Sequence, residues 1–197
     1  MYENTAITEP RWKSWIVQTT TPLFTPEQCR QIIESGRSQK PQQAQVGMDS
    51  PKGLVDTNRR ITKISWIPFK EMGHMYRDLN IFIQKTNENH FGFGDIQVTE
   101  QAQFTEYPVG GFYDWHMDCD VNMGHEPPVR KISMTLLLND PAEFKGGDLE
   151  LMAPGKVASL KQGHAIIFAS FLNHRVNPVT EGMRQSLVVW FGGKPFR

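Results

Sequence analysis

The stretch that decides the fold is Tyr107-Pro108-Val109-Gly110-Gly111-Phe112-Tyr113-Asp114-Trp115-His116-Met117-Asp118. Aromatic and β-branched residues on both sides of two adjacent glycines predict two strands joined by a bend. Because side chains alternate between the two faces of a strand, His116 and Asp118 point to the same face. The stretch therefore predicts a sheet surface that carries an imidazole beside a carboxylate.

A third ligand from a distant strand completes this pair. Chance places His and Asp two residues apart in many proteins, so the pair alone is equally compatible with a structural role. His174 begins a later apolar segment and supplies a second imidazole. Two histidines and one carboxylate on one face of a six-coordinate ion leave three positions open, as in non-haem Fe(II) oxygenases and unlike closed structural zinc sites. We therefore predict a metal site made of His116, Asp118 and His174.

The order of predicted elements indicates the fold class. Thr25, Pro26 and Gln28 form the pattern of a capping box at a helix start, and Gly36 is expected to end that helix. Apolar residues at spacings of three and four predict a second helix over 69–88, packed beneath the larger sheet. Apolar runs predict strands over 96–107, 131–139, 149–152, 165–169, 174–179 and 185–191. Helices followed by antiparallel strands predict an α+β fold, a double-stranded β-helix (jelly-roll, cupin-like) with N-terminal supporting helices.

Four segments, in this order, resemble the Fe(II)/2-oxoglutarate-dependent dioxygenases of the prolyl 4-hydroxylase-like group, which includes PKHD-type and oxygen-sensing members. They are Y-P-V-G-G-F-Y-D-W-H-M-D at 107–118, L-L-L-N-D at 136–140, G-G-D-L-E-L at 146–151 and H-R-V-N-P-V-T-E-G-M-R-Q-S at 174–186. The resemblance covers roughly residues 95–193, about half of the chain. The segment R-R-I-T-K-I-S-W at 59–66 fits the N-terminal support region of the family less specifically.

The resemblance implies a role for each matching residue. The three predicted ligands would bind Fe(II), and Arg184 would pair with the distal carboxylate of 2-oxoglutarate, whose other carboxylate and keto oxygen would chelate the metal. A guanidinium suits this task because its fork binds a carboxylate bidentately. Ser186 would add a hydroxyl to the same carboxylate, and Tyr107 would hydrogen-bond the co-substrate. Without the resemblance, Arg184 would be read as a surface cation and Tyr107 as a half-buried strand aromatic.

The reaction implied by the resemblance is the hydroxylation of an unactivated C–H bond with O2, releasing succinate and CO2. A prolyl residue in a protein or peptide is the expected substrate, as for a procollagen-proline 4-dioxygenase-like enzyme, and ascorbate is expected as a stimulant. Two alternatives remain open: a hydroxylase of a free amino acid or small metabolite, and a non-catalytic jelly-roll binding module. The intact ligand set together with Arg184 speaks against the binding module. Candidate substrate contacts are Arg59, Arg60, Tyr113 and Trp190, although the last two are equally compatible with packing.

Composition sets the remaining expectations. The 197 residues suit one domain over 1–197, with helical support at about 20–90 and the jelly-roll core at about 95–193. Lys plus Arg and Asp plus Glu are 21 each, so no net charge favours nucleic acid or an anionic membrane. The sequence has no apolar run of about 18 residues and no basic start followed by an apolar segment, which predicts a soluble cytoplasmic protein. Cys29 and Cys119 do not indicate a disulfide framework.

Overall fold

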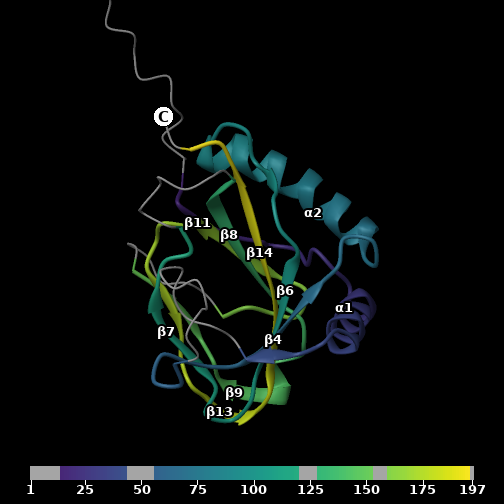
Figure 1. Ribbon diagram of the computed structural model, residues 1–197, viewed down its shortest axis with the longest axis vertical. Coiled ribbons are helices and arrows are strands. Elements are labelled where there is room, and N and C mark those ends of the chain that lie inside the picture. Colours follow the sequence, from purple (N-terminus) through teal and green to yellow (C-terminus); the bar gives the residue numbers. More distant parts are fainter. Residues whose placement is uncertain (1–13, 44–55, 120–127, 153–158, 196–197) are drawn as a thin grey trace, which may run out of the picture.

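The computed structural model describes residues 14–43, 56–119, 128–152 and 159–195. Two antiparallel sheets face each other within these residues, with two helices on the outer side of the larger sheet (Figure 1). The prediction of an α+β double-stranded β-helix is confirmed. The polar sequence at 37–58 predicts a loop, for which the resemblance implies a lid, and residues 44–55 of this segment lie outside the described residues.

The larger sheet holds eight strands of the described chain. Its order is β1 (Ile16–Gln18), β11 (Ala165–Ala169), β8 (Val129–Leu137), β14 (Arg184–Gly193), β6 (Ala102–Tyr107), β4 (Lys63–Ile67) and β2 (Gln42–Gln43), and β5 (Gln97–Val98) pairs with the far end of β14. The central strands β8 and β14 are buried along most of their length. Both faces of these strands are therefore covered, by the helices on one side and by the smaller sheet on the other (Figure 1).

The smaller sheet supplies two of the predicted metal ligands. Its order is β10 (Leu149–Leu151), β12 (His174–Val176), β7 (Phe112–His116) and β3 (Arg60–Ile61). The predicted strand-bend-strand unit is confirmed, because β6 ends at Tyr107, Gly110 has a positive φ of 79° and β7 begins at Phe112. The predicted strand over 174–179 is divided into β12 and β13 (Val179–Gly182), which pairs with β9 (Phe144–Gly146). Pro178 lies in the break, where it cannot donate a ladder hydrogen bond.

Helix α1 (Pro26–Ser38) has the predicted capping box. The Gln28 N–H donates to Thr25 Oγ1 over 3.2 Å, and the Thr25 N–H donates to Gln28 Oε1 over 2.8 Å. The predicted end at Gly36 is wrong, since the helix continues for two more residues. Gly36 is instead a packing residue, because a Cβ at this position would clash with the ring of Phe104 on β6. Sequence alone reads such a glycine as a helix stop.

Helix α2 (Gly73–Thr86) carries the predicted apolar face. It begins four residues later than expected and is followed by a π-helical turn, η1 (Asn87–Phe91), so the predicted range 69–88 is correct in type but not in its bounds. The Tyr76 hydroxyl donates to Ile67 O and accepts from the Ala102 N–H, which ties α2 to β4 and β6. Packing of α2 thus stabilises the sheet that carries the site. Neither this helix nor α1, within the described ranges, is long and apolar enough to cross a bilayer.

Candidate metal centre

Three ligand atoms converge at one end of the smaller sheet. His116 is the last residue of β7 and His174 the first of β12, and the two are directly paired across the strands. Asp118 lies just beyond β7, where its N–H donates to Ser170 O over 3.0 Å. Its carboxylate oxygens lie 3.7 Å from His116 Nε2 and 3.5 Å from His174 Nε2. All three ligand atoms lie within 4.8 Å of one another, close enough to hold one ion.

Backbone carbonyls orient both imidazoles. His116 Nδ1 lies 2.7 Å from Asp114 O, and His174 Nδ1 lies 3.0 Å from Leu172 O. A carbonyl only accepts hydrogen bonds, so each Nδ1 carries the proton and each Nε2 presents its lone pair towards Asp118. This is the usual outer arrangement of a metal-binding histidine.

The surroundings of His116 and Asp118 keep both groups in the protonation states that metals require. Burial lowers the pKa of His116 to about 3, helped by the neighbouring His174 and opposed by Asp118. For Asp118, burial raises the pKa, but His174, His116, Arg130 and the Ser133 hydrogen bond outweigh it and lower the pKa to about 2. Neutral imidazole and ionised carboxylate are the ligand forms, so His116 and Asp118 can bind a cation at neutral pH without first losing protons.

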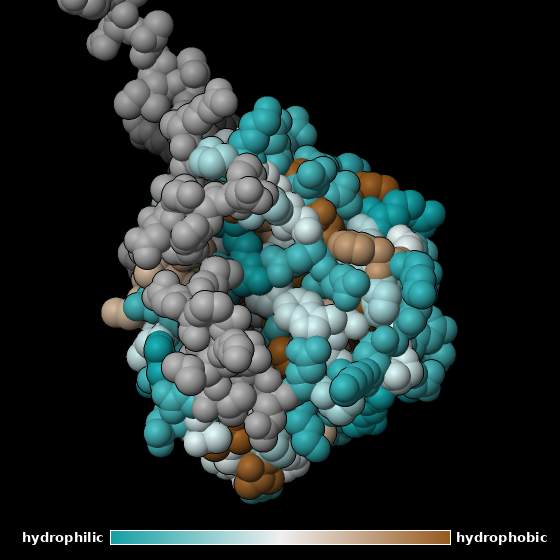
Figure 2. Space-filling view, viewed as in Figure 1, coloured by the Kyte–Doolittle hydropathy of each residue, from teal (hydrophilic) through white to brown (hydrophobic). Residues whose placement is uncertain are grey.

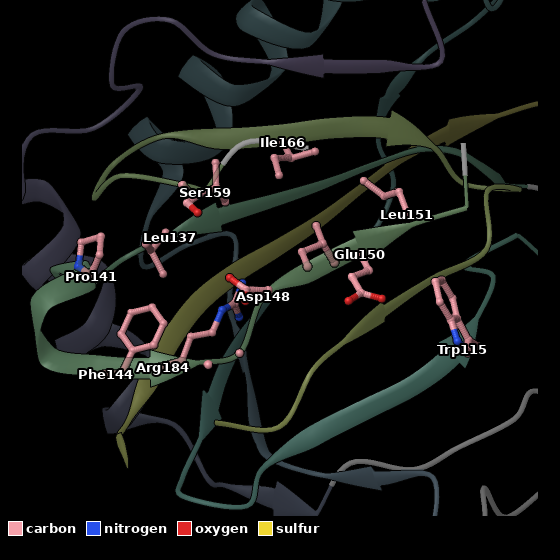
Figure 3. A pocket seen from close by; sticks show the side chains of 14 residues that line it. Trp115, Leu137, Pro141, Phe144, Asp148, Glu150, Leu151, Ser159, Ile166 and Arg184 are labelled. Carbon is pink, nitrogen blue, oxygen red and sulfur yellow. The ribbon is translucent and has the colours of Figure 1, made fainter. Parts of the chain in front are cut away.

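Arg184 lies on the opposing sheet with the properties of an anion anchor. It begins β14, directly across from Tyr107 at the end of β6, and its guanidinium carbon lies 5.4 Å from the Tyr107 ring centroid. It is 3% exposed, and its Nη1 donates to Ser186 Oγ over 3.0 Å. Among the described residues, no carboxylate lies within 4.0 Å of it, although Asp148 points towards it (Figure 3). Burial lowers the pKa of Arg184, against the influence of Tyr107 and Asp148.

The space around Arg184 fits a small dicarboxylic acid. Arg184 lines a cavity of about 640 Å³ together with Leu137, Leu149 and Ile166, which make one wall apolar (Figure 3). The cavity meets the site at Arg184, and the metal ligands are not part of its lining. A Cβ at Gly147 would lie 2.7 Å from Arg184 Cδ, so this glycine leaves the room that the arginine needs. A buried cation beside an apolar wall suits the distal carboxylate and methylenes of 2-oxoglutarate.

A buried hydroxyl without a hydrogen-bond partner also indicates a ligand near Arg184. Thr105 lies directly across from Ser186 on β6, is fully buried, and its Oγ1 has no partner among the described residues. Buried hydroxyls are nearly always hydrogen-bonded in native proteins, so an acceptor from a ligand is expected on this face. The donor set and this unmet group together fit Fe(II) and 2-oxoglutarate.

Comparison with known proteins agrees with this geometry. Residues 102–192, from the start of β6 to the last residue but one of β14, match the family model of the 2OG-Fe(II) oxygenase superfamily. This segment of the chain is therefore similar to the 2OG-Fe(II) oxygenases. The matched segment contains all three ligands and Arg184.

Relatives with known names match less than half of this chain. A PKHD-type hydroxylase of Colwellia psychrerythraea is 40% identical over 89 residues, which are 44% of this chain and 40% of that protein. A PKHD-type hydroxylase of Acidovorax ebreus is 34% identical over 93 residues, 45% of this chain and 41% of that protein. The chain therefore spans less than half the length of these relatives.

Solved structures support the fold over nearly the whole chain. A Pseudomonas putida prolyl-4-hydroxylase superposes with a TM-score of 0.66 at 21% identity, covering 92% of this chain and 94% of its own. The viral collagen prolyl hydroxylase of Paramecium Bursaria Chlorella virus-1 gives 0.71 at 16% identity, covering 92% and 97%. Because the sequence identities are low, these similarities show the jelly-roll fold of the chain and nothing further.

Two serines that sequence reasoning missed support the candidate metal ligands. Ser133 Oγ on β8 donates to Asp118 Oδ2 over 2.6 Å and lies 2.9 Å from Ser170 Oγ. Both serines are fully buried. The available signal was the alternation of small polar and apolar residues in β8, which places Ser133 on the face opposite to Ile132 and Met134.

The structure separates the four candidate substrate residues. Tyr113 stacks on the His116 ring at 3.5 Å between centroids, and the Arg60 guanidinium carbon lies 4.2 Å from the Tyr113 centroid. Trp190 is directly across from Ser133, and Arg130 stacks on it at 3.8 Å. Arg59 is exposed, its carbonyl accepts from the Asp114 N–H, and its charge acts on Tyr113. Tyr113 therefore contacts a candidate metal ligand directly, Arg60 contacts Tyr113, and Arg59 approaches this pair from the exposed side.

The two cysteines, Cys29 and Cys119, are both buried, and no disulfide bond joins them. On the face shown in Figure 2 the described surface is mostly hydrophilic, and its apolar residues form small separate groups.

Proposed function

We propose that this chain is an Fe(II)- and 2-oxoglutarate-dependent hydroxylase and that it acts on a prolyl residue of a protein or peptide. The observation that carries the proposal is the pairing of a compact His-Asp-His set with a buried arginine that lacks a carboxylate partner in the described chain. One half is built for a divalent cation and the other for an anion. A binding module has no chemical need for both.

The residues divide the work between holding, orienting and excluding water. His116, Asp118 and His174 would hold Fe(II), with the Nδ1 hydrogen bonds fixing the rings. Arg184 and Ser186 would bind the distal carboxylate of 2-oxoglutarate. When bound, Fe(II) and 2-oxoglutarate supply the activation of O2 needed to hydroxylate an unreactive C–H bond, with succinate and CO2 as products. Burial of these side chains keeps bulk water from the reacting groups.

Two observations support a prolyl substrate. Aromatic rings lie near the candidate metal ligands, since Trp190 is directly across from Ser133 and lies 6.0 Å from Trp66 between ring centroids. Such rings suit an apolar pyrrolidine. Solved structures with this fold include a prolyl hydroxylase from Trichoplax adhaerens in complex with a hypoxia inducible factor peptide fragment. A free amino acid or small metabolite is the alternative substrate class, and ascorbate as stimulant, one domain over 1–197 and a cytoplasmic location stay predictions.

The decisive experiment is an anaerobic titration of the Fe(II)-loaded protein with 2-oxoglutarate, monitored by the weak visible charge-transfer absorption of the chelate. Wild type is expected to develop the band. His174→Ala should lose it, and Arg184→Ala should need far more 2-oxoglutarate to reach it. His74→Ala, an exposed position on α2, is the matched control and should behave as wild type. Folded wild-type protein without a band would contradict the proposal.

Succinate release then separates the substrate classes. Turnover that rises with proline-rich peptides supports the prolyl reading. Turnover that rises only with free amino acids or small metabolites replaces it with the alternative, and an intact chelate band with no stimulation by any peptide would remove the prolyl assignment.

A further inference from the structure

Arg60 is a buried cation on the metal side of the site. It lies on β3, directly paired with Tyr113 on β7, and is 8% exposed. Its guanidinium stacks on Tyr113, and its Nη2 donates to the neutral Gln103 Oε1 over 2.9 Å. Its Nε is buried without any partner. The guanidinium is therefore packed and oriented, yet neither its charge nor its Nε–H is satisfied.

Comparison with the other arginines shows how unusual this is. Five arginines of the described chain lie within 4.0 Å of a carboxylate: Arg30, Arg37, Arg77, Arg130 and Arg175. In the same part of the chain, the two buried arginines without such a carboxylate are Arg60 and Arg184. A buried charge without a counter-ion is costly, and proteins keep one where a ligand supplies the counter-ion. For Arg184 that ligand is the co-substrate.

Arg60 cannot share this carboxylate with Arg184. Its partner Gln103 is across from Val188, whereas Arg184 is across from Tyr107, four residues further along β6. Four residues of strand span about 13 Å. The Arg60 guanidinium, the Tyr113 ring and the His116 ring form one continuous stack, so Arg60 belongs to the metal side of the site.

We propose that Arg60 binds a carboxylate carried by the substrate, so that the substrate class of this site is a carboxylate-bearing molecule. The inference rests on the proposed function and specifies its substrate. A carboxylate fits better than a neutral carbonyl because it compensates the charge as well as accepting from Nε. The Nε–H of Arg60 is free to donate to one oxygen of a carboxylate, while its Nη2 stays bound to Gln103.

Two sources can supply this carboxylate next to a prolyl ring. One is the α-carboxylate of free proline or of a C-terminal prolyl residue. The other is the side chain of an acidic residue that follows an internal proline. Matched probes distinguish them: N-acetyl-L-proline against N-acetyl-L-prolinamide for the first, and a short blocked peptide with an internal Pro-Glu against the same peptide with Pro-Gln for the second.

The test is equilibrium binding of these probes to the full chain, loaded with Fe(II) and 2-oxoglutarate under anaerobic conditions so that no turnover occurs, measured by calorimetry. At least one carboxylate probe is expected to bind about tenfold or more tightly than its neutral partner, as for a charge-assisted hydrogen bond. Arg60→Gln should abolish this preference, and Arg60→Lys should retain part of it. Lys63→Gln, which removes an exposed cation from the adjoining strand β4, should leave it unchanged.

The possible results separate this inference from the proposed function. If the chelate band forms in wild type but neither carboxylate probe is preferred, or the preference survives in Arg60→Gln, the assignment of Arg60 is wrong and the oxygenase assignment stands. If no band forms in wild type, both fail. An intact band and an unchanged thermal unfolding midpoint in Arg60→Gln establish that a lost preference is not a loss of folding, and Arg60→Lys serves the same purpose if the Gln variant is unstable.

Discussion

Removing the Ser133 hydroxyl is expected to weaken metal binding without removing a ligand. Ser133 Oγ donates to Asp118 Oδ2 over 2.6 Å. Asp118 Oδ2 in turn lies 3.5 Å from His174 Nε2. The hydroxyl thus fixes the rotation of the carboxylate about its side-chain axis. In Ser133→Ala the carboxylate keeps its charge but loses the group that directs it towards the metal position.

The magnitude follows from the geometry of this bond. A hydrogen bond to a charged acceptor contributes about 1.5–3 kcal/mol, and full burial of Ser133 favours the upper part of that range. This corresponds to a loss of roughly tenfold to 150-fold in metal affinity, in line with the 10–100-fold typical of groups that support metal ligands. The Asp118 pKa of about 2 leaves room for an increase without protonation at pH 7, so the effect is one of orientation.

The assay is a competition titration of Fe(II) or Co(II) against a chelator of known affinity, under anaerobic conditions. Ser170→Ala is the matched control, because the Ser170 side chain contacts Ser133 and its backbone carbonyl holds the Asp118 N–H. It should lose only a few-fold in affinity. If Ser133→Ala binds metal within twofold of wild type while Asp118→Ala binds none, the orientation argument is refuted.

Three further outcomes are expected. Gly36→Ala should lower the free energy of unfolding by about 1–3 kcal/mol through the clash with Phe104, whereas Gly73→Ala, whose added Cβ meets nothing within 4 Å, should be neutral or stabilising in a urea titration. The metal-free protein should lose stability as the pH falls from 7 to 4. His116 has a pKa of about 3 in the folded state but about 6.5 in the unfolded state, so the unfolded state gains the proton first. In denaturant titrations the midpoint should fall less for His116→Gln than for wild type. At 100 times its dissociation constant, 2-oxoglutarate should add about 2.7 kcal/mol to the unfolding free energy of the Fe(II)-loaded wild type. The same concentration should add little to that of Arg184→Gln. Thermal unfolding measures both.

The candidate metal ligands could be predicted from the sequence because their arrangement is largely local. His116 and Asp118 are two residues apart at the end of a strand, so chain geometry alone brings them together. His174 and Arg184 are distant in sequence, but each stands at the first residue of its strand, where the apolar pattern and preceding turn residues mark the boundary. Fold class followed from the same periodicities, since helix and strand spacings differ.

Features that depend on contacts between distant segments could not be predicted from the sequence. Whether Gly36 ends a helix or packs within it depends on Phe104, which lies 68 positions away on another strand. The support from Ser133 depends on a loop residue and a β8 residue meeting across two sheets. The sequence nominated Arg59 and Arg60 alike, and only the pairing of β3 with β7 buries one and leaves the other exposed. Tertiary neighbours decide such questions, and single-chain patterns do not contain them.

The buried polar atoms without partners show where this fold departs from the rules of a closed core. Among the described residues there are four such side-chain atoms, and three of them belong to Arg60, Thr105 and Trp190. Thr105 shares its sheet face with Ser186, and Trp190 shares its face with Ser133. Each therefore lies beside a group that contacts Arg184 or Asp118. A buried polar atom without a hydrogen-bond partner costs free energy, which a bound ligand can recover. Among the described residues nearly all other buried side-chain polar atoms have a partner. We therefore infer that ligands supply the partners missing at these three residues.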